Sequence, residues 1–260
     1  MNLENRLVLV TGANGGIGRA LCRLLDAAGA RIVMNGTREA DLQSLRRELG
    51  PDHAVVPADI SMAAGRDELE KVTRNLGGVD VLVNLAGVLD CDFFSRQSEE
   101  AIERILNVNS LGPVLLTRRL LPQMLTKPAA RIVNVGSIFG SIGHPGFAAY
   151  CASKATLKML SEALARELGD TSVSVGYIAP RATDTPLNDG RVVALNRALG
   201  NRSDTPEYVA GEILKVIEGN ARQRFLGWPE KFFVRLNALL PGVVHKALAG
   251  KMPVIRKILG

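Results

Sequence analysis

Residues 6–18 read Arg6-Leu7-Val8-Leu9-Val10-Thr11-Gly12-Ala13-Asn14-Gly15-Gly16-Ile17-Gly18. Up to Thr11 the run is short, apolar and β-branched, which predicts a buried strand. A helical pattern through Leu21, Leu24 and Leu25 follows the glycines. An ordinary strand-to-helix turn is the alternative, but three spaced glycines favour a turn whose backbone approaches a dinucleotide diphosphate at the helix N-terminus. The stretch therefore predicts the opening of a dinucleotide-binding fold.

The end of the second predicted strand, residues 30–35, bears on the choice of cofactor. At this place an acidic residue binds the ribose 2′-hydroxyl of NAD, whereas a basic residue accepts the 2′-phosphate of NADP. The sequence continues Asn35-Gly36-Thr37-Arg38, and the first carboxylate is Glu39. Arg38 can form a charge-assisted pair with a phosphate and Thr37 can offer a hydroxyl, which favours NADP(H) over NAD(H). The alternative for Arg38 is a solvated residue that begins the next helix.

Strands and helices alternate along the rest of the chain, without internal repeats or linkers. Helical patterns separate further predicted strands at residues 54–57, 79–83, 131–135, 173–178 and 223–226. A long helical segment over 99–126 contains Asn109, which is costly in so apolar a helix unless it is hydrogen-bonded, and which can hold a kink or a water. Residues 187–204 are predicted to form a mobile flap. The alternation predicts one α/β domain.

The composition lacks signals for secretion or membrane spanning. Apolar residues make up 47% of the 260 residues and aromatic ones only 4%, which suits a core of Val, Ile, Leu and Ala. Three cysteines lack ligand-like spacing and cannot all pair, so reduced thiols, no metal site and a cytoplasmic location are predicted. The N-terminus lacks the features of a signal peptide, and no run approaches ~18 uninterrupted apolar residues.

Residues 228–260 carry most of the positive charge. The formal net charge is +6, and this segment holds six Lys or Arg residues against Glu230 alone, a net charge of +5. Its apolar residues recur at helical spacing, interrupted at Pro241-Gly242. A basic amphipathic helix is typical of peripheral contact with a membrane surface; the alternative is a helix packed over the substrate cleft or a neighbouring subunit. Because the charge is not interleaved with stacking aromatic residues, no nucleic-acid binding is predicted.

A tyrosine and a lysine stand four residues apart in Tyr150-Cys151-Ala152-Ser153-Lys154 and would share one helix face. A nearby ammonium favours tyrosinate and would lower the phenol's pKa from about 10 towards neutrality. The spacing alone fits a bland surface pair as well. Ser137 follows the strand 131–135, at the edge of the sheet where ligands bind, and Tyr150 begins the next helix. His144, between them, is either a turn residue or a substrate contact.

Taken together, the motifs resemble the short-chain dehydrogenase/reductase family over residues 5–226. The resemblance rests on Thr11-Gly12-x-x-x-Gly16-x-Gly18, Asn84-x-Ala86-Gly87, Asn109, Ser137 and Tyr150-x-x-x-Lys154, in this order and spacing. It implies a single-domain Rossmann-type doubly wound parallel sheet with helices on both faces and a C-terminal helical extension. Residues 1–227 would form the NAD(P)-binding catalytic domain, and 228–260 a basic amphipathic extension of it. The implied activity is hydride transfer at a nicotinamide, interconverting a carbonyl and an alcohol.

The resemblance implies a role for each matched residue. Tyr150 would be the acid in reduction and the base in oxidation, Lys154 would lower its pKa and hold the nicotinamide ribose, and Ser137 would hydrogen-bond the substrate oxygen. Asn109 would fix a water that relays protons to Lys154. Asp59 suits an adenine contact and, equally, a helix cap. The predicted cofactor contacts are Gly12, Asn14, Gly16, Ile17, Gly18, Thr37, Arg38, Asp59, Ile60, Asn84, Ala86, Gly87, Tyr150, Lys154, Pro180, Thr183 and Thr185.

Two residues depart from the family pattern. Leu85 stands where a second asparagine is usual, and Arg181 replaces the usual glycine after Pro180, which puts the geometry of that loop in question. An apolar carbonyl or alcohol substrate, lipid-like, acyl or polycyclic, is predicted from the tail and from Leu89, Phe93, Phe94, Phe139 and Phe147. The resemblance also implies a homodimer or homotetramer. An NAD-dependent alcohol dehydrogenase of the same family and a non-catalytic NADP(H)-sensing Rossmann protein are the alternatives.

Overall fold

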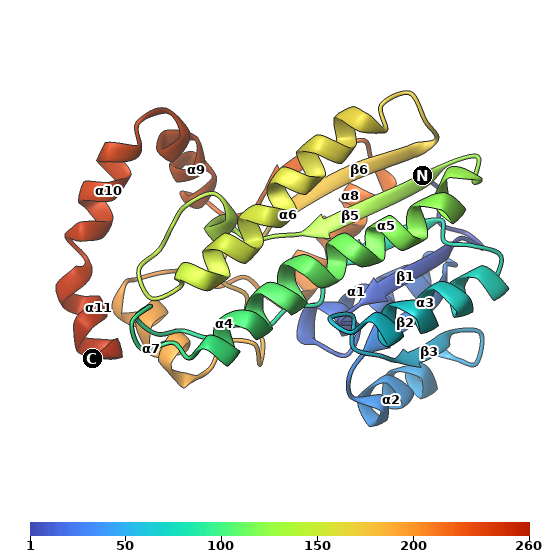
Figure 1. The fold of residues 1–260 in the computed structure, drawn as a ribbon, viewed down its shortest axis with the longest axis horizontal. Helices are drawn as coiled ribbons and strands as arrows, with labels where there is room; N and C mark the ends of the chain where they lie inside the picture. Colours follow the sequence, from blue (N-terminus) through green and yellow to red (C-terminus); the bar gives the residue numbers. More distant parts are fainter.

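The structure, a computed structural model that describes residues 1–260, is built on one seven-stranded parallel sheet (Figure 1). The strand order is β3-β2-β1-β4-β5-β6-β7. The strands are β1 (Leu7–Thr11), β2 (Arg31–Gly36), β3 (Ala54–Pro57), β4 (Val81–Asn84), β5 (Ala130–Val135), β6 (Val173–Ala179) and β7 (Gln223–Phe225). Val10 of β1 lies beside Met34 of β2 and Val83 of β4. The order reverses between β1 and β4, where sheets of this kind bind ligands at their carboxyl ends.

Both faces of the sheet are buried, because residues along β1 alternate between two cores. Val8 and Val10 pack with residues of α1 (Gly16–Ala27), α2 (Glu39–Leu49) and α8 (Pro206–Glu218). Leu7 and Leu9 pack with residues of α3 (Ala63–Asn75), α5 (Gly112–Leu125) and α6 (Ala148–Glu167) on the opposite face. The predicted doubly wound Rossmann-type arrangement is confirmed.

The long helix predicted over 99–126 is interrupted by a π-helical turn. It consists of α4 (Glu99–Leu106), the π turn Asn107–Leu111, and α5. The turn contains Asn109, so the irregularity falls where an asparagine in an apolar helix had suggested a kink. Single π turns within α-helices are frequent at functional sites.

The C-terminal extension forms three short helices beyond the carboxyl ends of the strands (Figure 1). They are α9 (Glu230–Leu239), α10 (Pro241–Ala249) and α11 (Met252–Leu259), and the break between α9 and α10 falls at the predicted Pro241-Gly242. The flap residues 187–204 contain α7 (Gly190–Ala198), against which α11 packs. None of the helices combines the length and the apolar character needed to cross a membrane.

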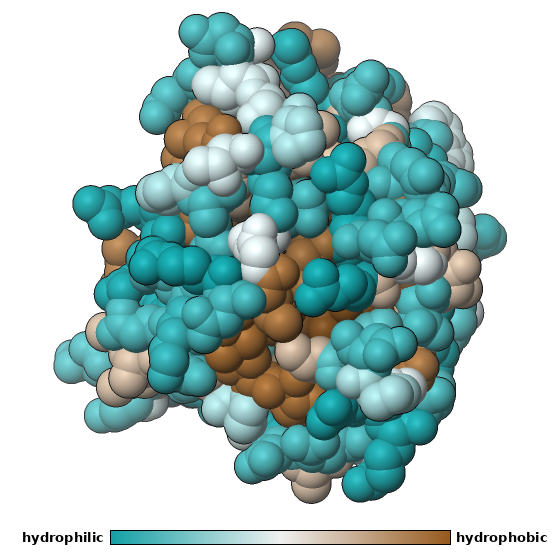
Figure 2. Space-filling model, turned by 90° about the vertical axis from the view of Figure 1, so that its right-hand side faces the viewer, coloured by the Kyte–Doolittle hydropathy of each residue, from teal (hydrophilic) through white to brown (hydrophobic).

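The surface is not uniformly polar. Figure 2 shows one side of the molecule, on which hydrophilic residues predominate and hydrophobic ones gather in a central hollow. Exposed apolar side chains also occur on α4, α5 and α6, where they include Leu106, Leu125 and Met159. The C-terminal extension contributes a larger set, namely Trp228, Phe232, Phe233, Leu239, Leu240, Val243 and Val254.

Candidate active site

The turn between β1 and α1 is held in a shape that requires glycine. Gly12 has a φ of +70°, and a Cβ on Gly18 would lie 2.2 Å from the carbonyl oxygen of Gly12. No side chain caps the N-terminus of α1 and no acidic residue lies in its first turn, so its positive end has no counter-charge of its own. Thr185 lies against Gly16, since a Cβ there would come 2.9 Å from the threonine methyl. The turn fits the diphosphate of a dinucleotide.

Thr11 ties this turn to the loop after β4. Its hydroxyl accepts hydrogen bonds from the amides of Leu85 (3.0 Å) and Ala86 (3.1 Å) and donates one to the carbonyl of Val83 (3.3 Å). Ala86 is thereby packed against Gly12, where an added Cβ would lie 2.8 Å from the Ala86 Cα. Because Leu85 takes part through its main-chain amide, its departure from the family's asparagine leaves this junction intact.

Two predicted cofactor contacts have side chains that point into the interior. The buried Asn84 amide donates to Asn134 Oδ1 (2.8 Å) and to the Thr117 hydroxyl (3.0 Å), so it braces β4 against β5 and α5. Ile60 is buried in the core with Leu69 of α3. The Ile60 side chain and the amide nitrogen of Asn84 therefore have protein partners, whereas Asn84 Oδ1 is buried without a hydrogen-bond partner.

Thr37 and Arg38 are exposed at the end of β2. The Arg38 side chain is 70% exposed, and its Nε lies 2.6 Å from a carboxylate oxygen of Asp41. Asn14 reaches the same strand end, since a Cβ on Gly36 would lie 2.3 Å from Asn14 Oδ1. Asn14, Thr37 and Arg38 therefore lie together at the strand end where a dinucleotide places its adenosine ribose.

Asp59 forms a tight turn before α3. Its Oδ1 accepts hydrogen bonds from the amide (2.8 Å) and hydroxyl (2.7 Å) of Ser61. The N-cap of α3 is Met62, which provides no side-chain cap. Asp59 therefore shapes the approach to the helix and is not its cap.

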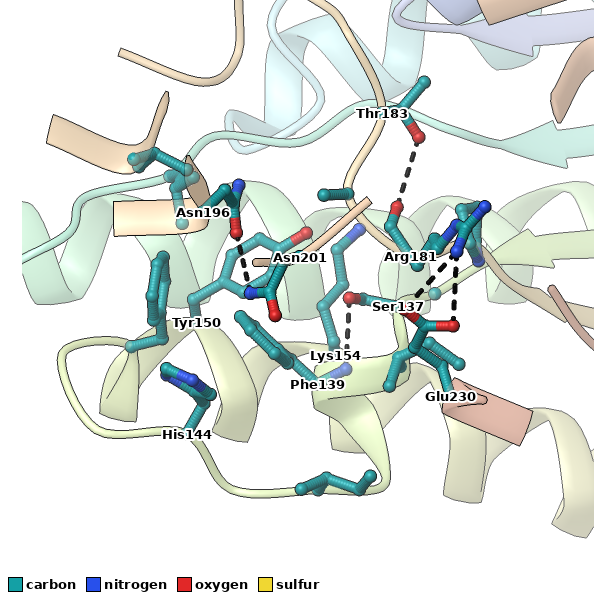
Figure 3. Close-up of a pocket in the computed structure, with 18 of the residues that line it drawn as sticks. Ser137, Phe139, His144, Tyr150, Lys154, Arg181, Thr183, Asn196, Asn201 and Glu230 are labelled. Carbon is teal, nitrogen blue, oxygen red and sulfur yellow. Dashed lines mark hydrogen bonds and ion pairs between the residues drawn. The ribbon is translucent and has the colours of Figure 1, made fainter. Parts of the chain in front are cut away.

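Ser137, Tyr150 and Lys154 line one cavity (Figure 3). Ser137 follows β5, and its hydroxyl oxygen accepts a hydrogen bond from the Phe139 amide (3.1 Å). Tyr150 and Lys154 lie on the first turns of α6 and are buried. Lys154 Nζ donates to the Val135 carbonyl (3.1 Å) and lies 5.8 Å from the centre of the Tyr150 ring. Three residues from two segments of the chain therefore meet as the sequence predicted.

Burial dominates the protonation of this pair. It raises the pKa of Tyr150 to about 12, opposed by the hydrogen bond with Ser137. It lowers the pKa of Lys154 to about 8. The lowered tyrosine pKa expected from a neighbouring ammonium is not found, because removal of water disfavours the charged form of both groups.

Asn109 is buried and clamps the strand end to α6. Its amide nitrogen donates to the Val88 carbonyl (2.9 Å) and the Ser153 hydroxyl (3.1 Å), and its oxygen accepts from the Val88 amide (2.8 Å). Both donors and one acceptor position are used, which leaves a single lone pair. The oxygen borders Gly87, as does Lys154 Nζ: a Cβ on Gly87 would lie 3.4 and 3.5 Å from them.

The cavity has a volume of about 350 Å³ and mainly apolar walls. Predicted residues that line it are Ile17, Gly87, Ser137, Phe139, Phe147, Tyr150, Lys154, Pro180, Thr183 and Thr185, together with Leu89. The flap adds Leu187 and Val192, and the tail adds Phe233, Leu236, Val243, Val244, Ala247 and Leu248. Of the two sequence interpretations of the tail, packing over the cleft is therefore realised by one side of α9 and α10.

His144 is both a turn residue and a cavity residue. Its ring stacks on Phe139 with centroids 4.9 Å apart and meets Phe147 edge-on at 5.5 Å. Burial lowers the pKa of His144. Phe93 and Phe94, whose apolar character had favoured an apolar substrate, do not line the cavity: Phe94 is 62% exposed, and Phe93 packs under the guanidinium of Arg96. The apolar composition could not indicate the direction of these side chains.

Arg181 joins the flap to the tail, a link that sequence reasoning did not anticipate. Its guanidinium pairs with Asp204 (2.7 Å) at the end of the flap and with Glu230 (3.4 Å) at the start of α9. Thr183 and Asp204 also form an isolated parallel bridge. The sequence shows that an arginine replaces the usual glycine at this position. It could not show that Arg181 pairs with two carboxylates, because these are 23 and 49 residues away.

The sequence and the structure are similar to those of known proteins. A family model described as short chain dehydrogenase matches residues 6–194. Nodulation protein G of Rhizobium sp. (strain N33) is 38% identical over 243 residues, which cover 84% of this chain and 98% of that protein. The 3-oxoacyl-[acyl-carrier-protein] reductase FabG of Vibrio cholerae is 33% identical over 219 residues, covering 82% and 90%.

Solved structures share the fold and include nicotinamide complexes. A short chain dehydrogenase/reductase from Burkholderia phymatum in complex with NAD has a TM-score of 0.86 at 23% identity, covering 94% of this chain and 96% of that one. A short chain dehydrogenase from Burkholderia cenocepacia in complex with NADP has a TM-score of 0.82 at 23% identity, covering 95% and 99%. The family match over most of the chain identifies the protein: it belongs to the short-chain dehydrogenase/reductase family of NAD(P)-dependent oxidoreductases.

Proposed function

We propose that this protein is an NADP(H)-dependent reductase that converts the carbonyl of an apolar ketone, lipid-like, acyl or polycyclic, into an alcohol. The observation that supports it most directly is the meeting of Ser137, Tyr150 and Lys154 in one cavity with mainly apolar walls. Preorganised donors in a site without bulk water stabilise an oxygen on which negative charge develops. The mainly apolar walls of the cavity provide such a site for the donors.

In the proposed reaction the chain supplies the proton. A bound reduced nicotinamide supplies the hydride. Because the pKa of Tyr150 is raised to about 12 by burial, the phenol keeps its proton at neutral pH and can act as an acid towards the substrate oxygen. The Ser137 hydroxyl accepts from the Phe139 amide, so its own proton, which faces Tyr150, can be donated to the same oxygen. The protonated phenol is the form of Tyr150 that a reduction requires.

Lys154 and Asn109 are proposed to resupply that proton. Burial lowers the pKa of Lys154 to about 8, so its ammonium can exchange a proton near neutral pH. The remaining lone pair of Asn109 can accept from a water beside Gly87, where Lys154 Nζ also lies. Lys154 would in addition hold the nicotinamide ribose.

The preference for NADP(H) rests on Arg38. Its exposed guanidinium at the end of β2 suits a 2′-phosphate, and Thr37 beside it offers a hydroxyl. Of the two carboxylates that follow, Asp41 is engaged by Arg38 itself, and Glu39 stands one residue beyond Arg38. An NAD-dependent enzyme would need an acidic group at the strand end itself, where Asn35, Gly36 and Thr37 offer none.

The substrate proposal rests on the walls contributed by the flap and the tail. Leu187, Val192, Phe233, Leu236 and Val244 can enclose an aliphatic chain or fused rings. The Vibrio cholerae relative is named a reductase of 3-oxoacyl groups, which are apolar chains with a ketone near one end. A 3-oxoacyl thioester is therefore one member of the proposed substrate class.

The proposal also covers the oligomeric state of the protein, its domain organisation and its location in the cell. Exposed apolar residues on α4, α5 and α6, among them Leu106, Leu125 and Met159, support a homodimer or homotetramer formed through these helices. Residues 1–227 would form the catalytic domain and 228–260 its extension. We expect a cytoplasmic protein.

The test follows reduced-nicotinamide absorbance with NADPH and NADH and a panel of ketones. We expect turnover of long-chain or polycyclic ketones with NADPH, and a loss of about 10²–10⁴-fold in kcat for Tyr150→Phe with unchanged NADPH binding. Activity confined to small polar ketones would contradict the substrate class. Tight NADPH binding without turnover of any ketone or alcohol would contradict the reductase and favour a cofactor sensor.

A further inference from the structure

The start of the C-terminal extension exposes an apolar surface that the cavity does not explain. Trp228, Phe232, Leu239 and Leu240 are exposed, Leu239 by 80% and Trp228 by 64%, and none of the four lines the cavity. Phe232 lies between Trp228 and Phe233, with ring centroids 6.1 and 5.8 Å apart. Exposed apolar residues gathered on one helix and the turns at its two ends mark an interaction surface. We call residues 228–243 the elbow, since they comprise α9 and its turn into α10.

The elbow and the chain after it are basic, and Glu230 is their only acidic residue. Residues 231–260 contain no Asp or Glu and six Lys or Arg residues. Lys231 lies 5.7 Å from the ring centre of Trp228, so cation and aromatic surface are adjacent. A Lys or Arg beside Trp, Phe and Leu is the composition of segments that lie in the interface of an anionic bilayer.

The opposite side of the same helices forms the cavity wall. Leu236 and Val244 line it from within, whereas Phe233 and Val243 both line the cavity and remain 40% and 53% exposed. These two residues therefore stand where the cavity meets the exposed apolar surface. A ligand that left a lipid surface at the elbow would pass from one apolar environment into another.

We propose that the elbow docks on an anionic lipid surface and admits apolar substrate to the cavity directly from it. No helix here can span a bilayer, so the contact is interfacial. A second copy of this chain fits less well, because two tails of net charge +5 repel each other and the remaining 227 residues carry a net charge of +1. The admission of substrate rests on the proposed function, whereas the docking does not.

The chain contains a single tryptophan, Trp228, which makes the contact directly observable. We would add vesicles of phosphatidylglycerol, and vesicles of phosphatidylcholine as the uncharged control, to the full-length protein and follow its tryptophan emission. A blue shift with phosphatidylglycerol, quenched by acyl-chain-brominated lipid and weakened by salt, is expected. An unchanged emission with phosphatidylglycerol would overturn the proposal. A blue shift without lipid that grows with protein concentration and doubles the mass would overturn it in favour of a second copy.

Two variants locate the contact. Leu239→Ser with Leu240→Ser should weaken vesicle binding at least about tenfold, because both side chains would lie in the interface. Lys231→Gln should weaken it about fivefold, since one cation near an anionic surface contributes about that factor. Met62→Ser, at a 61% exposed site just before α3, is the matched control and should bind normally. Equal binding by all variants would refute the elbow as the contact.

A turnover measurement separates this proposal from the proposed function. The double leucine variant should reduce a water-soluble ketone as fast as the wild type, because neither residue lines the cavity. It should lose the advantage that the wild type gains with a long-chain ketone presented in phosphatidylglycerol vesicles. An undiminished advantage would refute substrate admission through the elbow, whereas a lack of turnover in both proteins would refute the reductase and leave vesicle binding to decide the docking.

Discussion

A substitution of Arg181 would test how the flap and the C-terminal helices are held over the cavity. Its guanidinium is the common partner of Asp204 and Glu230, and the three side chains are 15%, 9% and 22% exposed. Asp204 Oδ2 is buried and has no hydrogen-bond partner, so Arg181 is the main compensation for that carboxylate. Arg181→Ala would leave a nearly buried negative charge unpaired.

The expected loss follows from that burial. Removing one partner of a fully buried pair costs about 3–5 kcal/mol. Because Arg181 and Glu230 keep some access to water, we expect a loss of about 2–3 kcal/mol in the free energy of unfolding. The KM for an apolar ketone should rise as well, since the flap and α9 both line the cavity.

Urea unfolding of a double-mutant cycle measures the effect. Asp204→Asn removes the unpaired charge, so Arg181→Ala should cost about 1–2 kcal/mol less in that background than in the wild type. Arg166→Ala is the control, because Arg166 pairs with Glu162 at an exposed i,i+4 position and should cost no more than about 0.5 kcal/mol. Additive effects of the two changes, or a loss no greater than that of Arg166→Ala, would refute the reasoning.

Four further predictions concern the site. Arg38→Ala should reduce the ratio of kcat/KM for NADPH over NADH by at least about tenfold, measured with one ketone; an unchanged ratio would exclude Arg38 as the phosphate contact. The kcat/KM for reduction should fall above about pH 8 as Lys154 loses its proton, and a profile flat to pH 10 would contradict that role. Burial lowers the pKa of Lys154 from the ordinary lysine value of 10.5 to about 8, so the unfolded chain binds more protons between these pH values and the contribution of Lys154 to stability rises with pH through that window. The stability of the wild type relative to Lys154→Met should therefore rise from about pH 8 to 10.5 in urea titrations, and a constant difference would contradict the lowered pKa. Gly18→Ala should abolish NADPH binding or folding, because its Cβ would lie 2.2 Å from the Gly12 carbonyl oxygen; a normally folded, cofactor-binding variant would contradict the packing of the turn.

The fold could be predicted from the sequence because the signals for its strands, turns and helices lie within short stretches of residues. A strand, a glycine turn and a helix follow one another between Leu7 and Ala27, and each is dictated by periodicity or by backbone freedom within a few residues. The same holds for the break at Pro241. The π turn at Asn109 was foreseen only as a kink, since its form depends on a bond to Val88 across the sheet edge.

The motifs could not predict contacts between side chains that are far apart in the sequence. Asn84 was predicted to lie along the cofactor, and the structure adds that its amide donates to Asn134 and Thr117, a buried partner set that no local pattern reveals. The 62% exposure of Phe94 was likewise not visible in the sequence. A motif fixes a residue's place on the backbone, whereas the direction of its side chain depends on neighbours contributed by distant segments.

The protonation of Tyr150 shows how such distant segments enter the chemistry. As an isolated pair, Tyr150 and Lys154 would favour an ion pair at neutral pH, and this is what their spacing suggests. In the folded chain Tyr150 is packed in a cluster with Val192 of the flap and with Ile255 of α11. These segments remove water from the phenol, and without water the neutral form is the stable one. In the proposed reaction the flap and the tail would therefore do more than enclose the substrate: by excluding water from the phenol they would keep on it the proton that a reduction consumes.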